Sequence, residues 1–171
     1  LYSFFTRGLV LKIEPISGKD GQEFLGPLLL TPTVFEDKRG FFYESWNELD
    51  FRNTLISSGS SNCSAEDIHF CQDNFSHSAQ GVLRGLHYQL PPEPQAKLIR
   101  CTSGAIFDVG VDLRKSSQTY GKWFGVELSS TNHQQLWLPV GFAHGFLAIT
   151  LEADVQYKAS GFWNPKCERS L

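Results

Sequence analysis

Methionine is absent from this 171-residue chain, and so is any excess of positive charge. The formal net charge is −3, which argues against general binding to nucleic acid or to acidic membranes. An anionic ligand would therefore need a local basic pocket. No apolar run is long enough to span a bilayer, and residues 1–7 lack the pattern of a signal peptide. A chain of this length can bury a sizeable core, so we expect one domain.

CxxC spacing is absent as well, because the four cysteines stand at positions 63, 71, 101 and 167. A chain of this size does not depend on a disulfide framework. We therefore expect reduced thiols and a cytoplasmic protein. The sequence opens without methionine and stops in an unfinished pattern, so we also expect both ends to continue in the intact protein.

Aromatic residues are plentiful at 13% of the chain, and they favour β structure. From Ile68 onward, short apolar segments and turn signals follow one another at roughly ten-residue spacing, which predicts an antiparallel sandwich or barrel. The predicted strands are 68–74, 81–89, 97–102, 105–113, 122–129, 134–138, 144–151 and 154–162. In 105–113 an apolar face that includes Phe107 alternates with a face that carries Asp108 and Asp112. We expect the carboxylate face to line a polar cavity and the apolar face to pack.

The first third of the chain predicts a short strand at 8–14, an edge strand that leads from residues 28–30 through Pro32 to 34–35, and a strand at 41–45 after a charged turn. The best helix candidate covers about residues 46–57. Ser45 and Glu48 have the spacing of a capping box, and Leu49, Leu55 and Ile56 would form the buried side. A polar loop over 57–65 follows.

The chain is organised around residues 74–108, where a strand carries Arg84 and His87 and a Pro-rich turn leads back to Lys97. Strict alternation places Arg84 and His87 on opposite faces, but Gly85 is a natural bulge site that would realign them. A histidine in a cavity can move protons near neutral pH, and an ammonium can stabilise an oxyanion as it forms. A core histidine and a solvated lysine are the structural alternatives. We favour the functional interpretation because the three side chains occur together.

Tyr157 shares a strand face with Val155 and Ala159. A phenol in that position can act as a general acid. The alternative is a half-buried tyrosine whose hydroxyl is simply hydrogen-bonded.

His144 follows Pro139 and Gly141 in a pattern that resembles the second motif of the cupin superfamily, where this histidine can bind a metal. The first cupin motif needs His-x-His, and the matching stretch here is residues 87–89, His-Tyr-Gln. Metal sites generally want three or more protein ligands, so we expect no metal. The other histidines with structural interest, His69, His77 and His133, lack ligand-like spacing and are expected at the surface.

Taken together, these motifs resemble the dTDP-4-dehydrorhamnose 3,5-epimerase family, where dTDP is deoxythymidine diphosphate. The matching stretches are collinear over about residues 28–171: 34–45, 72–74, 82–89, 97–101, 107–114, 135–146 and 157–158. The resemblance implies an all-β double-stranded β-helix (cupin, jelly-roll) with one or two short helices. It also implies no metal or cofactor, and a homodimer that exchanges N-terminal strands. We expect a single domain over 1–171, with 1–27 as an N-terminal extension and a missing C-terminal tail.

The family's reaction is the deprotonation of a dTDP-4-keto-6-deoxyhexose beside its C4 ketone, at C5 and C3, and reprotonation from the opposite face. The resemblance makes His87 the base, Lys97 the group that stabilises the enolate, and Tyr157 the acid. It assigns nucleotide-sugar binding to Arg39, Phe42, Glu44, Gln72, Asn74, Arg84, His144 and Trp163, with Trp163 stacking on thymine. The segment that holds Arg39, Phe42 and Glu44 reaches the pocket of the other subunit in relatives.

The sequence departs from the family in the residue that orients the catalytic histidine. Relatives place an Asp for this purpose beyond the position of Leu171, and Asp108 is the alternative within this chain. Three further functions stay open: a single-carbon epimerase of a related dTDP-4-keto sugar, a keto isomerase, and a non-catalytic cupin that binds nucleotide sugars. We expect neither a nucleic acid nor a membrane as partner.

Overall fold

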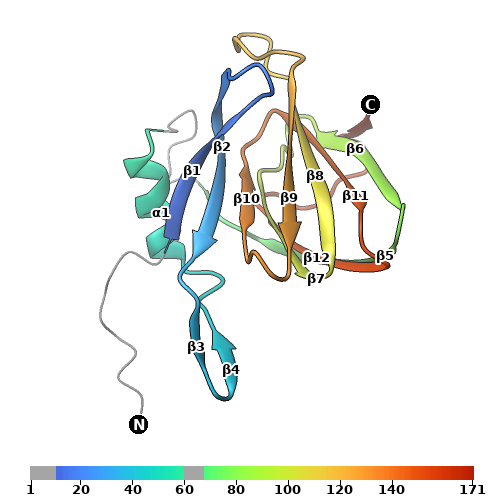
Figure 1. Cartoon of the computed structure of the whole chain (residues 1–171). Coiled ribbons are helices and arrows are strands. Elements are labelled where there is room, and N and C mark those ends of the chain that lie inside the picture. Colours follow the sequence, from blue (N-terminus) through green and yellow to red (C-terminus); the bar gives the residue numbers. More distant parts are fainter. Residues whose placement is uncertain (1–10, 60–67) are drawn as a thin grey trace.

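A computed structural model describes residues 11–59 and 68–171 (Figure 1). The first part holds β1 (Leu11–Ser17), β2 (Glu23–Pro32), β3 (Phe35–Asp37), β4 (Gly40–Phe42) and the helix α1 (Glu48–Ser57). The second part holds β5 (Gln72–Ala79), β6 (Leu83–Gln89), β7 (Lys97–Ser103), β8 (Ala105–Asp112), β9 (Trp123–Ser129), β10 (Gln135–Leu138), β11 (Phe142–Ala148), β12 (Glu152–Ala159) and β13 (Glu168–Ser170). No helix in these ranges has the length and apolar character that a membrane span requires.

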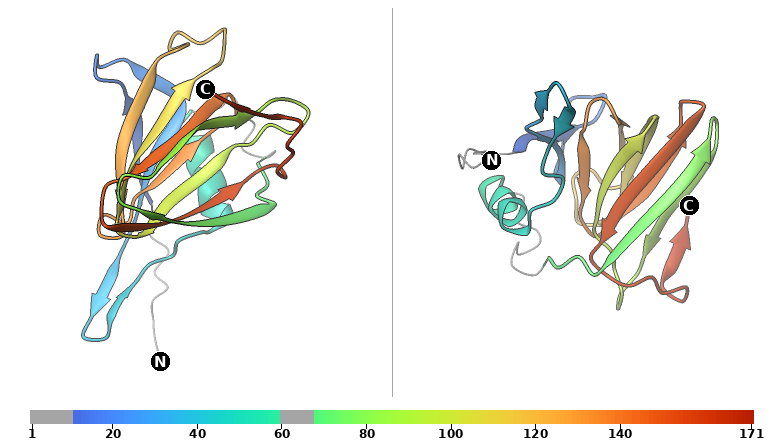
Figure 2. Two further views of the ribbon diagram at one scale, coloured as in Figure 1. Left: turned by 90° about the vertical axis from the view of Figure 1, so that its right-hand side faces the viewer. Right: turned by 90° about the horizontal axis from the view of Figure 1, so that it is seen from below.

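Two antiparallel sheets face each other (Figure 2). One has six strands in the order β1-β2-β10-β7-β12-β5, and the other has five in the order β13-β6-β11-β8-β9. The predicted all-β jelly roll is confirmed. The short β3–β4 hairpin forms a separate two-stranded sheet that projects away from the body (Figure 1). Residues 11–17, within the predicted N-terminal extension, form the edge strand of the larger sheet.

Two buried clusters hold the layers together, and alternation along β7 connects them. Ile99 faces the space between the sheets, where it packs with Ile106, Val155 and others. Leu98 faces the other way, into a cluster with Phe51 of α1. Full burial of each such side chain stabilises the fold by about 1.5–3 kcal/mol. The strand that begins at Lys97 is therefore fixed from both sides.

The helix forms near its predicted position, but its cap and buried face differ from the prediction. Asn47 is the N-cap, and its side chain accepts hydrogen bonds from the backbone N–H groups of residues 49 and 50. The predicted box on Ser45 is therefore wrong. Leu55 is buried as expected, whereas Leu49 and Ile56 are 68% and 61% exposed. The buried stripe is Phe51, Thr54 and Leu55, because these positions share the face that the helix presents to the sheet.

Several strand boundaries also differ. The strand predicted at 68–74 begins only at Gln72 and continues to Ala79, and β13 has no counterpart among the predictions. The predicted edge strand near 28–35 is wrong in place, because β2 spans Glu23–Pro32 and lies between β1 and β10. The segment predicted at 41–45 is shortened to the end of a hairpin. Residues 8–10 of the predicted first strand and residues 60–65 of the predicted loop lie outside the described ranges.

The alternation predicted for 105–113 is confirmed, but the roles of its faces differ from those expected. Asp108 and Asp112 are fully buried, whereas Phe107 on the apolar face is 37% exposed. The carboxylate face lies inside because its acids find partners there.

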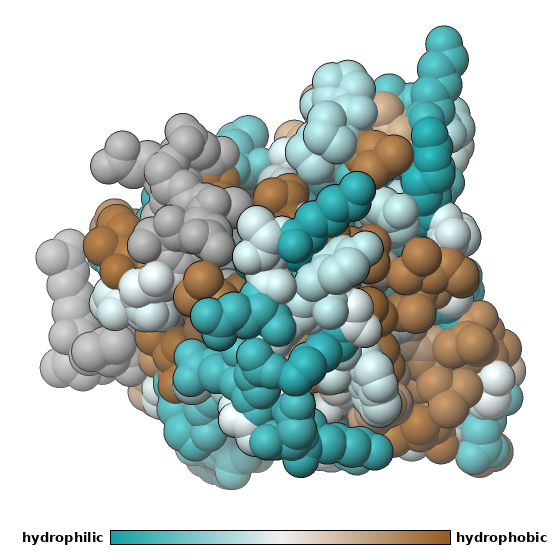
Figure 3. All heavy atoms as spheres, turned by 90° about the horizontal axis from the view of Figure 1, so that it is seen from above, coloured by the Kyte–Doolittle hydropathy of each residue, from teal (hydrophilic) through white to brown (hydrophobic). Residues whose placement is uncertain are grey.

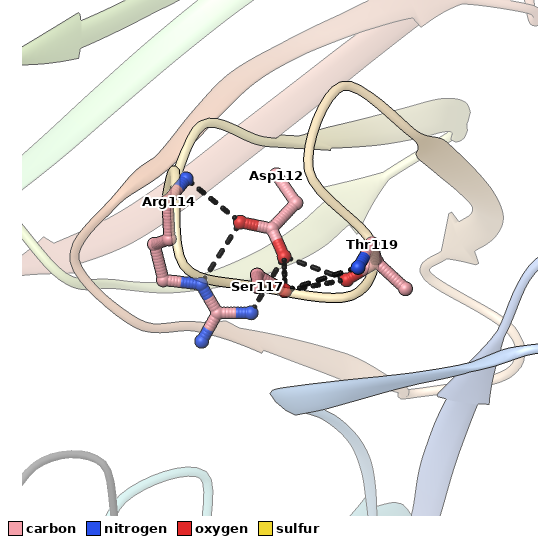
Figure 4. Close-up of polar contacts among 4 residues, drawn as sticks. All are labelled: Asp112, Arg114, Ser117 and Thr119. Carbon is pink, nitrogen blue, oxygen red and sulfur yellow. Dashed lines mark hydrogen bonds and ion pairs between the residues drawn. The ribbon is translucent and has the colours of Figure 1, made fainter.

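The partners of Asp112 close the turn between β8 and β9 (Figure 4). Its carboxylate accepts hydrogen bonds from Arg114 Nε at 2.9 Å, and from the Ser117 and Thr119 hydroxyls at 2.6 Å each. Burial raises the pKa of Asp112, but the hydrogen bonds from these three residues outweigh that effect and lower it to about 2. Asp112 thus fixes the end of β8, the strand that also carries Asp108.

Hydrophobic residues gather on the right-hand side of the molecule when it is seen from above, the side where Figure 1 places β5 and β6 (Figure 3). Phe75 on β5 and Leu83 on β6 are 67% and 69% exposed. Large apolar side chains are therefore available for contacts outside the described chain.

We predict that Phe51→Ala lowers the free energy of unfolding by about 3–5 kcal/mol, because the Phe51 ring packs against Trp46 and Trp137 at centroid distances of 5.1 and 5.2 Å. Leu49→Ala, on the exposed side of the same helix, should change it by no more than about 0.5 kcal/mol. Denaturant unfolding measures both. Equal losses in the two variants would contradict this assignment of the helix faces.

Candidate active site

A bulge in β6 brings Arg84 and His87 to the same side of the sheet. Along β11, His144 pairs with His87 and Phe146 with Arg84, so three steps on β6 match two on β11. The extra residue falls where Gly85 was expected to form a bulge. A Cβ at Gly145, on the facing strand, would come within 2.7 Å of the Arg84 carbonyl oxygen, so this close approach needs glycine.

His87 and Lys97 meet across the interior from opposite sheets. The distance from Lys97 Nζ to His87 Nε2 is 2.8 Å, and His87 Nδ1 lies 3.0 Å from the Gly85 carbonyl oxygen. Because a carbonyl only accepts, Nδ1 carries the proton and Nε2 accepts from the ammonium. The imidazole is therefore held uncharged, with its basic nitrogen toward Lys97.

The electrostatics of the pair follow from burial and from the contact between the two groups. Burial, and then the charge of Lys97, lower the pKa of His87 to about 4. Lys97 is only 3% exposed, and burial lowers its pKa to about 8 against the opposing charges of Asp108 and Glu168. Between these values the imidazole is a free base and the amine is an ammonium.

Tyr157 completes the group from β12, the neighbour of β7. Lys97 Nζ lies 5.5 Å from the centroid of the Tyr157 ring. Burial raises the pKa of Tyr157, while the charge of Arg84 lowers it in part. The phenol therefore keeps its proton at neutral pH. The structure brings the three residues predicted to carry the chemistry into one place.

His144 lies beside this group, with its ring centroid 5.8 Å from that of His87. Its Nε2 lies 2.6 Å from Asp108 Oδ1. Asp108 therefore bonds to His144, and the alternative in which Asp108 orients His87 is wrong.

A chain of hydrogen bonds lies beside His87, Lys97 and Tyr157, because Asn74 on β5 pairs with Tyr157. Gln72 donates to Asn74 at 2.9 Å and accepts from the Trp163 backbone at 3.0 Å. The Trp163 indole donates in turn to Glu168 at 3.2 Å, and its side chain is 57% exposed. An exposed ring held in this way offers a flat stacking surface.

Arg84 is anchored at the other side. Its Nε donates to the Ser78 hydroxyl, and its Nη2 donates to the His77 carbonyl, both at 3.0 Å. The guanidinium keeps further donors for an anion.

Comparison with known proteins shows the family of the chain. The family model described as dTDP-4-dehydrorhamnose 3,5-epimerase matches residues 22–171. The chain belongs to the dTDP-4-dehydrorhamnose 3,5-epimerase family.

Individual relatives cover most of the chain. It is 49% identical over 144 residues to the dTDP-4-dehydrorhamnose 3,5-epimerase of Shigella flexneri, covering 84% of this chain and 75% of the relative. The solved enzyme of that name from Elizabethkingia anophelis has a TM-score of 0.80 and 42% identity, covering 95% of this chain and 80% of that one. A 3,5-epimerase from Legionella pneumophila, solved in complex with dTDP-4-keto-L-rhamnose, has a TM-score of 0.79 and 39% identity, with coverages of 94% and 78%.

Three residues that the epimerase resemblance assigns to binding lie apart from His87, Lys97 and Tyr157. Arg39 bonds Asp37 in the projecting β3–β4 hairpin, where Phe42 is 60% exposed. Glu44 accepts a hydrogen bond from Asn47 at 3.0 Å, near the start of α1. Their predicted role in the pocket of a second subunit stays a prediction.

The surface position predicted for the remaining histidines is confirmed for two of them but not for His133. His69 and His77 are exposed, and His77 Nδ1 lies 2.6 Å from Asp154. His133 is half-buried, 5.0 Å from the ring of Phe41. In residues 11–59 and 68–171, His, Cys, Asp and Glu form no group of three or more that could hold a metal ion.

Sequence reasoning missed Glu168 in this epimerase-family site. Its charge raises the pKa of His87, Lys97 and Tyr157 alike, although it is a smaller influence than burial for each. Glu168 reaches the site because β13 pairs with β6, opposite Gln89. No motif or spacing in the sequence indicates that pairing.

We predict that His87 titrates at about pH 4 in the intact protein, whereas His77 beside Asp154 titrates above 6.5. Lys97→Met should raise the pKa of His87, because it removes a positive charge at 2.8 Å, but leave it below 6.5 because burial remains. Histidine NMR titration measures each value. Lys158→Met, which removes a lysine from the outer face of β12, should leave His87 unchanged; an ordinary His87 pKa in the wild type would contradict the proposed pairing.

Proposed function

We propose that the protein epimerises a dTDP-4-keto-6-deoxyhexose at C3 and C5. The observation that carries the proposal is the convergence of His87, Lys97 and Tyr157 between the sheets. The names of the relatives and the dTDP-4-keto-L-rhamnose bound to the Legionella pneumophila protein support the substrate class.

His87 acts as the base that removes the proton. A C4 ketone acidifies the C–H bonds at C3 and C5, so a base can take either proton without a redox cofactor. His87 Nε2 is unprotonated above about pH 4, and His87 Nδ1 is held by the Gly85 carbonyl. When the ketone oxygen of the substrate accepts the hydrogen bond of the Lys97 ammonium, His87 Nε2 loses that bond. Its lone pair is then free to take a proton from the sugar ring. General base help of this kind contributes roughly 10²–10⁴ in rate.

Lys97 stabilises the negative charge that forms in this step. Breaking the C–H bond moves an electron pair onto the C4 oxygen, giving an enolate. An ammonium in a nearly dry interior stabilises this oxygen far better than water can, and one such donor is worth on the order of 10²–10³ in rate. The enolate also offsets the repulsion between Lys97 and the newly charged imidazolium.

Return of a proton from the opposite face inverts the carbon. Tyr157 stays protonated at neutral pH because burial raises its pKa, and it stands on the sheet that faces β6. Its hydroxyl gives a proton to the enolate carbon, the ketone re-forms, and solvent restores both residues. The same arrangement serves C3 and C5, since both flank the C4 ketone.

The nucleotide is held away from the reacting carbons. Arg84 provides a guanidinium for the diphosphate, and Trp163 provides an exposed ring for thymine. Gln72 and Asn74 line the wall between them. His144 completes this proposed binding set next to His87.

We also propose a single epimerase domain and a homodimer in the cytoplasm. The two sheets share one core, which supports the single domain. Arg39, Phe42 and Glu44 lie on or beside a projecting hairpin, away from His87, which supports a role in the site of a second subunit. The exposed rings of Phe41 and Phe42 would be covered in such a contact.

Proton NMR of dTDP-4-keto-6-deoxyglucose in deuterated water tests the reaction. We predict that solvent deuterium enters at both C3 and C5. Exchange at one carbon alone would identify a single-carbon epimerase, and tight binding without exchange would identify a non-catalytic binding protein. Either outcome would overturn the double epimerisation.

His87→Ala should reduce this exchange by at least about 10²-fold, because it removes the base. Binding of dTDP should be retained, since the nucleotide contacts lie elsewhere. His69→Ala is the matched control: the exposed His69 should be dispensable for both. Substantial exchange in folded His87→Ala protein would exclude His87 as the base.

A further inference from the structure

Asp108 and His144 form a buried polar pair that the proposed chemistry does not use directly. Their side chains are 0% and 2% exposed, and they share one contact of 2.6 Å between His144 Nε2 and Asp108 Oδ1. Asp108 Oδ2 and His144 Nδ1 have no hydrogen-bond partner among the described residues. A buried carboxylate with an unpaired oxygen is costly unless nearby positive charge stabilises it.

The positive charge of this buried cluster comes from Lys97, on the opposite sheet. Asp108 bonds His144, the His144 ring lies 5.8 Å from that of His87, and His87 contacts Lys97 at 2.8 Å. The charge of Asp108 is the first of the influences that favour the Lys97 ammonium. The other groups around Lys97 are His87 from β6, the Tyr157 ring from β12 and the Glu168 carboxylate from β13. Of these groups, Asp108 and Glu168 alone supply negative charge, and Asp108 is the fully buried one.

We propose that Asp108 is a positioning residue, which fixes His144 through Nε2 and keeps Lys97 in its ammonium form beside an uncharged His87. The catalytic consequence rests on the proposed epimerisation, whereas the charge arrangement does not. Asp108 touches no reacting atom in this scheme. It acts through Lys97, which must carry a proton to stabilise the enolate, and through His144, whose free Nδ1 it directs.

Replacing Asp108 by Asn removes the negative charge and keeps the size of the side chain. Desolvation of Lys97 is then opposed by Glu168 alone, so the Lys97 pKa falls. His87 titrates near pH 4, where Lys97 keeps its proton in both proteins, so the His87 pKa does not rise through Lys97. Simple loosening of the fold would instead re-expose Lys97 to water and raise its pKa.

NMR titration of lysine Cε signals tests the charge arrangement without any substrate. Lys97 should titrate at about pH 8 in the wild type and about one pH unit or more lower in Asp108→Asn. Asp73→Asn removes a carboxylate from the outer face of β5, where it bonds Lys158, and should leave Lys97 unchanged. An unshifted Lys97 in folded Asp108→Asn protein would overturn the proposal.

If Asp108→Asn does not fold, a second variant, His144→Gln, still tests the proposal. This variant removes the imidazole but leaves the Asp108 charge, so the Lys97 midpoint should stay near 8 or rise. A fall of about one unit in His144→Gln would show that the imidazole, and not the carboxylate, holds Lys97 in its charged form.

The pH dependence of kcat/KM tests the catalytic consequence. The ratio of the wild-type kcat/KM to that of Asp108→Asn should shrink about fivefold as the pH falls from 8 to 6. At the lower pH Lys97 of the variant regains its proton, while His87 is still a free base. A deficit that is the same at both pH values would indicate a purely structural role. A wild type that exchanges no substrate protons would refute the proposed function, and the NMR titrations would still decide the role of Asp108.

Discussion

The contact between Lys97 Nζ and His87 Nε2 is the interaction on which the rest of this structure depends. It places an ammonium against the lone pair of an imidazole inside a barrel, so each group constrains the protonation of the other. Two sheets are needed to form it, because β6 and β7 lie on opposite layers. In the proposed reaction, a ketone that binds between them meets a base and a cation at once.

The fold fixes this contact from several directions. Leu98 and Ile99 anchor the two faces of β7 in separate cores, directly after Lys97. The bulge at Gly85 turns Arg84 to the side of His87, so that one strand presents an imidazole and a guanidinium on the same side. A site with buried charges is costly to build, and the packing energy of the two clusters offsets that cost.

The sequence was sufficient to predict most strands from β5 to β12, the bulge, and the three side chains of His87, Lys97 and Tyr157 that the fold brings together. Those features follow from alternation, from glycine and from collinear motifs. It was not sufficient for Glu168, whose place depends on the pairing of β13 with β6, or for the bond between Asp108 and His144, which joins two strands of the folded sheet. The helix face was misjudged because Leu49 and Ile56 are apolar, although the sheet contacts the side that carries Phe51. Local patterns report propensity and periodicity, whereas these features depend on tertiary contacts.

A neutron crystal structure at pH 7 tests the central claim most directly, because it locates the protons of the pair. The account predicts one deuteron on His87, at Nδ1 toward the Gly85 carbonyl, a bare Nε2, and three deuterons on Lys97 Nζ. Deuterons on both imidazole nitrogens, or only two on Nζ, would contradict it.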